Sequence, residues 1–273
     1  MPDKAEYFRS LHRAPPVLVL PNAWDAATAR VFEAAGFRAV ATTSAGVAAA
    51  LGYPDGGVVP PREMIEAIAR IARAVEVPVT ADIEHAYAAT PTAVAEVVLR
   101  VIAAGAVGIN IEDCLPGAAD LEPILLQADK IKAVVKAASN AGIRVVINAR
   151  TDVFLRQIGD PSQRLDMAIA RGNAYRTAGA DSVFVPGVTD APTIQSLTRG
   201  IAGPVNVLAV AGTPPVSELE QLGVARVSVG SGPMRASIAL VHEVAQELKT
   251  RGTYTSYTAR ALPYTDLNDL MRR

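Results

Sequence analysis

Short apolar runs alternate with amphipathic segments along the whole chain. The runs have the β-branched character of strands buried in a parallel sheet, and the segments between them carry apolar residues three or four positions apart, which is the period of a helix that buries one face. The strand centres are Leu18, Val40, Val79, Ile109, Val146, Val183, Val207 and Val227. Eight strands, each followed by a helix, predict the α/β class and a closed TIM (β/α)₈ barrel.

Proline and glycine residues set the predicted boundaries of these elements. One helix is predicted to begin at Pro60-Pro61, and the others cover about 4–13, 25–35, 91–104, 125–141, 161–178 and 233–249. One strand is predicted to begin at Pro78, and the others cover about 17–20, 38–42, 107–111, 143–149, 181–185, 205–210 and 226–229. Four glycines stand just before a strand, where each can end a helix in the left-handed conformation: Gly36, Gly105, Gly142 and Gly179.

The length of 273 residues suits one such barrel, although length alone also allows two domains. Because no linker interrupts the alternation, residues 1–273 are predicted to form a single (β/α)₈ domain, with 233–273 as its last helix and a tail. A doubly wound open sheet is the alternative fold. That fold usually places a glycine-rich phosphate loop after its first strand, where this chain has Pro21-Asn22-Ala23-Trp24.

Composition narrows the class of ligand. The chain has 26 basic and 27 acidic residues without long blocks of one sign, so no nucleic-acid partner is expected. No apolar stretch approaches the roughly 18 residues that span a bilayer, so no membrane partner is expected either. The N-terminus lacks an apolar signal core, and a lone cysteine excludes an intrachain disulfide. These features favour a cytoplasmic protein with a small-molecule ligand.

Carboxylates follow two neighbouring predicted strands. Asp82 and Glu84 end the third strand, and Glu112 and Asp113 end the fourth. Burying acids at adjacent strand ends is costly unless a cation neutralises them, and Mg²⁺ prefers such oxygen ligands. The alternative is that Glu84 and Asp113 are solvated loop acids or helix caps.

The other strands also end in polar residues, which a barrel would bring to one face because active sites form at the C-terminal ends of its strands. These residues are Asn22, Trp24, Thr43, Ser44, Asp55, Arg150, Asp152 and Asn206. Several acids around one arginine suit a metal-chelated anion, with Arg150 clamping an oxygen of a 2-oxo acid that can form an enolate. Trp24 would either line this pocket or cover the barrel mouth.

The motifs at these positions resemble those of the isocitrate lyase / phosphoenolpyruvate mutase superfamily over roughly residues 15–250. They are Trp24-Asp25, Thr43-Ser44-Ala45-Gly46-Val47-Ala48, Leu51-Gly52-Tyr53-Pro54-Asp55, Thr80-Ala81-Asp82-Ile83-Glu84, Asn110-Ile111-Glu112-Asp113 and Asn148-Ala149-Arg150-Thr151-Asp152. The resemblance implies a Mg²⁺-dependent enzyme of 2-oxo or 2-hydroxy acids on a TIM barrel. It also implies a dimer-based tetramer in which the eighth helix is swapped between subunits.

The resemblance also implies roles for individual residues. Asp82 would bind the metal directly, and the metal-bound waters would be held by Glu84, Glu112 and Asp55. Thr43 and Ser44 would receive the substrate carboxylate, and Arg150 would complete the anion site. We list Arg150 and Glu112 as the catalytic candidates, and Asn206 and Trp24 as further substrate-binding candidates.

One loop departs from the family pattern. The lyase branch carries a Lys-Lys-Cys-Gly-His-type loop after the position of Glu112, and the phosphonate branch a Lys-Thr-Asn-Ser-type loop, whereas this chain has 114–121, Cys-Leu-Pro-Gly-Ala-Ala-Asp-Leu. Carbon–carbon bond cleavage through an enolate is the function favoured here. Phosphorus–carbon bond chemistry of the phosphonopyruvate kind and a 2-oxo acid binding protein without catalysis are the alternatives.

Overall fold

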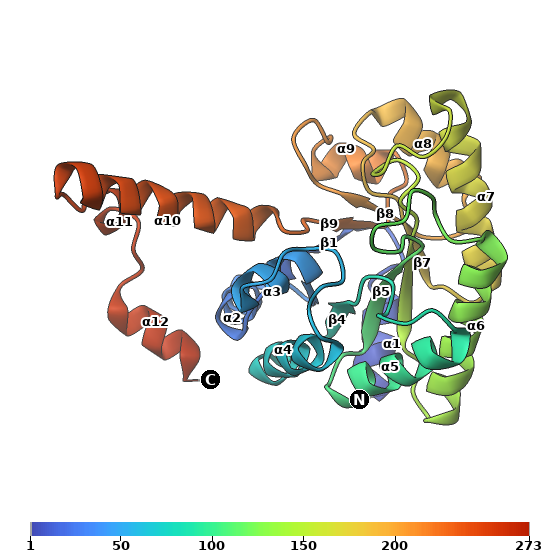
Figure 1. Ribbon diagram of the computed structural model, residues 1–273, viewed down its shortest axis with the longest axis horizontal. Coiled ribbons are helices and arrows are strands. Elements are labelled where there is room, and N and C mark those ends of the chain that lie inside the picture. Colours follow the sequence, from blue (N-terminus) through green and yellow to red (C-terminus); the bar gives the residue numbers. More distant parts are fainter. Residues whose placement is uncertain (1, 273) are drawn as a thin grey trace.

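A ring of parallel strands forms the centre of the fold, and helices cover it on the outside (Figure 1). The computed structural model describes residues 2–272. The strands are β1 Leu18–Leu20, β2 Asn22–Ala23, β3 Val40–Thr42, β4 Val79–Asp82, β5 Gly108–Glu112, β6 Val146–Arg150, β7 Ser182–Phe184, β8 Val205–Leu208 and β9 Arg226–Ser228. They pair in the order β1-β9-β8-β7-β6-β5-β4-β3-β2.

The barrel closes through a single bent strand at the N-terminus. β1 pairs with β9 and β2 pairs with β3, and only Pro21 separates β1 from β2. Proline has no backbone N–H to donate, so the ladder is interrupted where the chain changes partner. Counting β1 and β2 as one strand gives the eight of the predicted barrel, and the α/β barrel prediction is confirmed.

The outer layer consists of helices at the positions the sequence predicts, together with further helices between and after them. They are α1 Pro2–Ser10, α2 Ala26–Ala34, α3 Ser44–Leu51, α4 Pro61–Ala74, α5 Pro91–Ala103, α6 Ile124–Asn140, α7 Arg164–Thr177, α8 Ala191–Gly200, α9 Val216–Gln221, α10 Gly232–Arg251, α11 Thr255–Thr258 and α12 Tyr264–Met271, with a 3₁₀ turn, η1, at Pro161–Gln163. The four glycines expected to end helices all have positive φ. The predicted strand 143–149 begins only at Val146.

Helix α1 closes the N-terminal end of the barrel. Phe8 is fully buried and forms an apolar cluster with Leu20 and Val146, among others. A Cβ atom at Gly108 would lie 2.8 Å from the Phe8 ring, so only glycine allows this close approach. The opposite end of the barrel, where the strands finish, is therefore the open one.

Helix α10 leaves the barrel instead of packing on it, and α11 and α12 turn back toward α2 (Figure 1). Arg30 on α2 donates to the carbonyl oxygen of Leu270 at 3.2 Å, which ties α12 to the barrel. Large apolar side chains on α10 remain exposed, among them Ile238, Val241 and Leu248. A search of the described helices finds none long and apolar enough to cross a membrane.

Candidate active site

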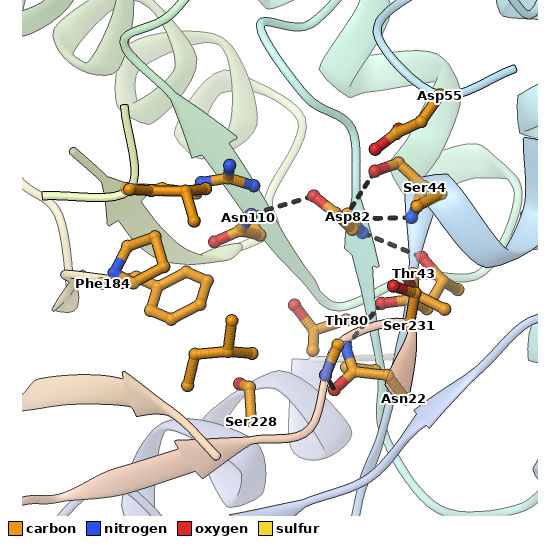
Figure 2. Close-up of a pocket in the computed structure, with 18 of the residues that line it drawn as sticks. Asn22, Thr43, Ser44, Asp55, Thr80, Asp82, Asn110, Phe184, Ser228 and Ser231 are labelled. Atoms are coloured by element: carbon orange, nitrogen blue, oxygen red, sulfur yellow. Dashed lines mark hydrogen bonds between the residues drawn. The ribbon is translucent and has the colours of Figure 1, made fainter. Parts of the chain in front are cut away.

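A cavity of about 230 Å³ opens at the C-terminal ends of the strands (Figure 2). It is smaller than the ~300–1,000 Å³ of drug-sized pockets, so it suits a small organic molecule. The sequence-predicted residues that line it are Asn22, Thr43, Ser44, Asp55, Asp82 and Arg150. Asn22 lies on β2, Thr43 and Ser44 follow β3, Asp82 and Arg150 end β4 and β6, and Asp55 comes from the segment after α3.

Asp82 is fixed in orientation by the residues on either side of it. Its Oδ2 accepts hydrogen bonds from the Ser44 backbone N–H at 3.0 Å and from the Ser44 hydroxyl at 2.8 Å. Its Oδ1 accepts from the Asn110 amide at 2.9 Å (Figure 2). Three donors hold the carboxylate, so its orientation toward the cavity is fixed before any ligand binds.

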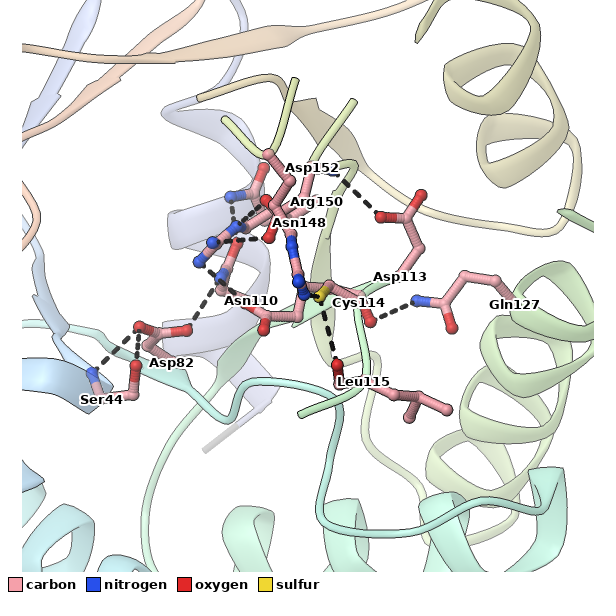
Figure 3. Close-up of polar contacts among 12 residues, drawn as sticks. Ser44, Asp82, Asn110, Asp113, Cys114, Leu115, Gln127, Asn148, Arg150 and Asp152 are labelled. Carbon is pink, nitrogen blue, oxygen red and sulfur yellow. Dashed lines mark hydrogen bonds and ion pairs between the residues drawn. The ribbon is translucent and has the colours of Figure 1, made fainter. Parts of the chain in front are cut away.

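The bond from Asn110 to Asp82 continues across the barrel as a row of polar side chains (Figure 3). Asn148 Nδ2 donates to Asn110 Oδ1 at 3.0 Å, and Ser182 Oγ donates to Asn148 Oδ1 at 2.7 Å. Asp82, Asn110, Asn148 and Ser182 are register partners on consecutive strands, so one layer of the barrel holds the row. The row gives each buried amide a partner and fixes Asn110 with its NH₂ group toward Asp82.

Arg150 lies between two carboxylates at the cavity wall. Its Nη1 is 2.8 Å from Glu112 Oε2, and its Nε and Nη2 donate to the two oxygens of Asp152 at 2.6 and 2.9 Å (Figure 3). Its guanidinium carbon is also 5.9 Å from the centre of the Phe184 ring. The pKa of Arg150 is raised, because the charges of Glu112 and Asp152 outweigh the effect of burial. Arg150 is therefore a permanent cation.

Glu84 brings a further acid to this end of the barrel. Burial, followed by the charges of Asp82 and Asp55, raises the pKa of Glu84 to about 7. Its backbone has a φ of 52°, a left-handed conformation that is uncommon for a residue with a side chain and that marks a constrained turn after β4. The negative charges gathered here therefore exceed the positive charge that Arg150 supplies.

This charge imbalance and the donor chemistry fit Mg²⁺. Asp55, Asp82, Glu84 and Glu112 offer only oxygen ligands, which are the ligands Mg²⁺ takes in proteins. Within residues 2–272, no three His, Cys, Asp or Glu side chains are grouped to coordinate one metal ion by themselves. Mg²⁺ characteristically keeps several waters and takes one or two carboxylates, so a site with Asp82 as the main ligand suits this ion.

Helix α3 begins at the cavity. Thr43 is its N-cap, and the Thr43 hydroxyl accepts from the Gly46 N–H at 3.4 Å. The resemblance implied that Thr43 and Ser44 receive the substrate carboxylate, but the sequence analysis did not predict a helix at Ser44–Leu51. The positive end of the α3 dipole strengthens the same attraction for an anion next to Thr43 and Ser44.

Six of the sequence-predicted residues lie outside the cavity lining: Trp24, Glu84, Glu112, Asp113, Asp152 and Asn206. Trp24 lines a separate surface depression together with Leu51 and Met271. Asn206 is fully buried and exchanges hydrogen bonds with Ser228, which does line the cavity. Asp113 points to the other side of β5, where Tyr175, Arg171 and the Asp152 N–H bind it at 2.7, 3.1 and 3.0 Å (Figure 3).

The sequence analysis assigned no role to several polar side chains inside the barrel. Thr80, Asn110, Ser228 and Arg226 line the cavity, and Asn148 lies behind Asn110. Their spacing in the sequence was the available signal. Thr80, Asn110, Asn148 and Arg226 stand two positions before Asp82, Glu112, Arg150 and Ser228, respectively. Residues two apart on a strand share a face.

The loop after Glu112 is fastened to the barrel by Arg156. Arg156 donates to the Ala118 carbonyl at 2.7 Å and to Cys114 Sγ. Burial raises the pKa of the Cys114 thiol, so it is largely protonated at neutral pH. His85 follows Glu84 and stacks edge-on against Tyr87. Neither Cys114 nor His85 lines the cavity.

Known proteins match this chain over most of its length. A family model described as phosphoenolpyruvate phosphomutase matches residues 8–249. An uncharacterised protein of Mycobacterium tuberculosis is 37% identical over 261 residues, which cover 95% of this chain and 94% of that protein. An oxaloacetate decarboxylase of Bradyrhizobium sp. is 30% identical over 261 residues, which cover 92% of this chain and 86% of that enzyme. The structure of a candidate lyase/mutase from Burkholderia cenocepacia J2315 superposes with a TM-score of 0.91 at 40% identity, and the match covers 98% of this chain and 95% of that one.

Proposed function

The chain belongs to the phosphoenolpyruvate mutase/isocitrate lyase superfamily, and on that premise we propose that it is a Mg²⁺-dependent enzyme that cleaves a carbon–carbon bond in a small 2-oxo acid or dicarboxylate. In such a reaction the electron pair of the broken bond is taken up as an enolate, which then accepts a proton. The reaction is of the lyase, decarboxylase or hydrolase type. The superfamily consists of Mg²⁺-dependent enzymes and includes lyases, decarboxylases and hydrolases of small oxo acids.

The observation that carries this proposal is that Asp82 and Arg150 line one small cavity with opposite fixed charges. Asp82 would hold the metal, with Glu84, Glu112 and Asp55 holding its waters. Mg²⁺ bound there would polarise the carbonyl group of the substrate and offset the negative charge that develops on it. Asp82 needs no reorientation for this role, because Ser44 and Asn110 already hold its carboxylate.

The cationic side of the cavity would hold the substrate's anionic groups. Thr43 and Ser44 at the start of α3 would receive the carboxylate next to the oxo group. Arg150, which Glu112 and Asp152 keep in place, would contact an oxygen on which charge accumulates when the bond breaks. Preorganised charges of this kind lower the barrier because they need no reorganisation during the reaction.

A substrate panel tests the proposal. The purified protein is incubated with Mg²⁺ and, separately, with oxaloacetate, 2-methylisocitrate, 2,3-dimethylmalate and phosphonopyruvate, and consumption of each is followed. We expect consumption of at least one of the first three, and its loss on addition of EDTA. Consumption of phosphonopyruvate alone would favour phosphorus–carbon chemistry, and binding without any consumption would favour a 2-oxo acid binding protein.

We propose in addition that α10 is exchanged between subunits of a dimer-based tetramer. The support is the exposed apolar face of α10, with Ile238, Val241 and Leu248 at 57, 61 and 50% exposure, on a helix that extends away from its own barrel (Figure 1). Apolar residues spaced three or seven apart on one helix need a covering surface. The barrel of a second copy would supply it.

A further inference from the structure

Two arginines line the cavity, Arg150 and Arg226, and Arg226 is the more deeply buried. Among residues 2–272, Arg226 has no carboxylate partner. It begins β9 and retains 2% exposure. Its Nε donates to Ser228 Oγ at 3.3 Å, and its Nη1 is buried with no hydrogen-bond partner in that part of the chain. The buried Lys130, by contrast, is paired with Glu122 at 2.5 Å.

An unpaired guanidinium inside a barrel is costly, so its presence calls for a counterion. Burial lowers the pKa of Arg226 to about 9 while the charge of Asp82 raises it, and the side chain remains protonated at neutral pH. Asp82 forms no ion pair with it in the described chain, and the two Asp82 oxygens accept hydrogen bonds from Ser44 and Asn110 instead. The positive charge of Arg226 is therefore available to a ligand in the cavity.

The histidine next to Arg226 is uncharged. His12, in the turn after α1, donates through Nδ1 to the Phe8 carbonyl at 2.9 Å, and burial together with the nearby Arg226 lowers the pKa of His12 to about 3. Its Nε2 is buried and, within the described residues, also without a partner. A buried water between His12 and Arg226 could satisfy both hydrogen-bonding groups, but it would leave the charge of Arg226 uncompensated.

The cavity connects Arg226 to the Asp82 end of the site. Arg226, Ser228 and Thr80 line it together with Asp82, Ser44 and Arg150. The hydroxyl of Thr80 has no partner among residues 2–272. Arg226 stands two residues before Ser228 on β9, so it lies deeper in the barrel on the same face. One cavity thus has a carboxylate near its mouth and an unpaired cation below it.

We propose that Arg226 is a specificity-determining residue that binds a second anionic group of the substrate, so that the cavity selects a dicarboxylic 2-oxo acid over a monocarboxylic one. The inference rests on the proposed function, because the 2-oxo end of the ligand is taken to bind at Asp82. The carboxylate would accept from Arg226, and Thr80 offers a further hydroxyl group beside it. A methyl group at that position would leave the guanidinium unpaired.

Oxaloacetate and 2-oxobutyrate test this, because both have four carbons and differ in a carboxylate against a methyl group. Their dissociation constants are measured by calorimetry with Mg²⁺ in excess, or as kcat/KM where the ligand is consumed. We expect the wild-type protein to favour oxaloacetate at least tenfold. Arg226→Gln should weaken oxaloacetate at least tenfold and change 2-oxobutyrate less than threefold. His12→Gln is the matched control, since it alters the other side of Arg226 outside the cavity and should keep the preference.

The outcomes separate the two proposals. If the wild-type protein binds neither acid, the proposed function itself is contradicted. Binding of both acids with equal affinity, or a preference that survives in Arg226→Gln, would overturn the role of Arg226 alone. If Arg226→Gln does not fold, Arg226→Met serves, because it keeps a long side chain and removes the charge. A lowered melting temperature with an unchanged preference in Arg226→Met would mean a purely structural arginine.

Discussion

Arg150 Nη1 lies 2.8 Å from Glu112 Oε2, while its Nε lies 2.6 Å from Asp152 Oδ1 on the other side. The three side chains come from adjoining positions, because Glu112 and Arg150 are register partners on β5 and β6 and Asp152 follows β6. Two edges of the planar guanidinium are therefore fixed by the protein before any ligand binds. Lysine offers one ammonium group and cannot occupy both positions.

Arg150→Lys should weaken the binding of a 2-oxo dicarboxylate tenfold to a hundredfold, or about 1.5–3 kcal/mol, because a charge-assisted, geometrically fixed contact is lost. The melting temperature should fall by only a few degrees in a chain of this length. Calorimetric titration with Mg²⁺ in excess measures the first effect and thermal unfolding the second. An unchanged dissociation constant with a lowered melting temperature would limit Arg150 to holding Glu112 and Asp152 in place.

Asp82→Ala or treatment with EDTA should abolish measurable binding of 2-oxo acids, because the proposed site binds them through the metal. The fold should persist, since the buried layer of Asn110, Asn148 and Ser182 remains hydrogen-bonded. Asp129→Ala is the control, because Asp129 forms an exposed pair with Lys132 on α6, and such pairs contribute little to stability. Binding that is undiminished in EDTA would exclude the metal from ligand recognition.

The barrel could be predicted because its strands are short, buried on both faces and separated by helices with one apolar face. Helix α3 could not, since Ser44–Leu51 consists of small and apolar residues and has no polar face that would reveal its period. The final helix was expected near 233–249, but its direction away from the barrel depends on tertiary contacts that no local pattern encodes. Sequence periodicity identifies a helix and leaves its partner open.

The acids at the strand ends could be predicted for a related reason, because a charged residue directly after an apolar run must lie where the strand leaves the core. Arg226 was counted only as part of a strand, since a single arginine among apolar residues more often has a solvated head. Its inward orientation follows from the pairing of β9 with β8 and β1, which fixes the face it shares with Ser228. That pairing becomes known only when the barrel is closed.

His12 should make the stability of the protein depend on pH. Its pKa is about 3 in the folded chain, against 6.5 for an ordinary histidine, chiefly because it is buried. Below pH 6.5 the unfolded state therefore binds a proton that the folded state excludes, and the free energy of unfolding falls as pH falls toward 3. Between pH 7.5 and 5.5 this group alone should remove about 1.4 kcal/mol.

The measurement is urea unfolding of wild-type protein and His12→Gln at both pH values. Because other groups titrate equally in both proteins, the variant should lose about 1.4 kcal/mol less than the wild type over this interval. His242→Gln, at an exposed position on α10, should follow the wild type. Equal pH dependence in all three proteins would mean that His12 is protonated inside the fold.

Helix α10 should hold the oligomer together. Light scattering at micromolar concentration should give about four times the 28.5 kDa of one chain, because the apolar face of α10 needs a partner surface. Val241→Asp, at 61% exposure in the single chain, should lower this mass, since it would bury an unpaired carboxylate in the subunit contact. Leu125→Asp on α6 is the matched control, because its 74% exposed side chain lies away from α10, and it should leave the mass unchanged. A wild-type mass of 28.5 kDa would contradict both the tetramer and the exchange of α10, and equal loss of mass in both variants would point to a contact other than this helix.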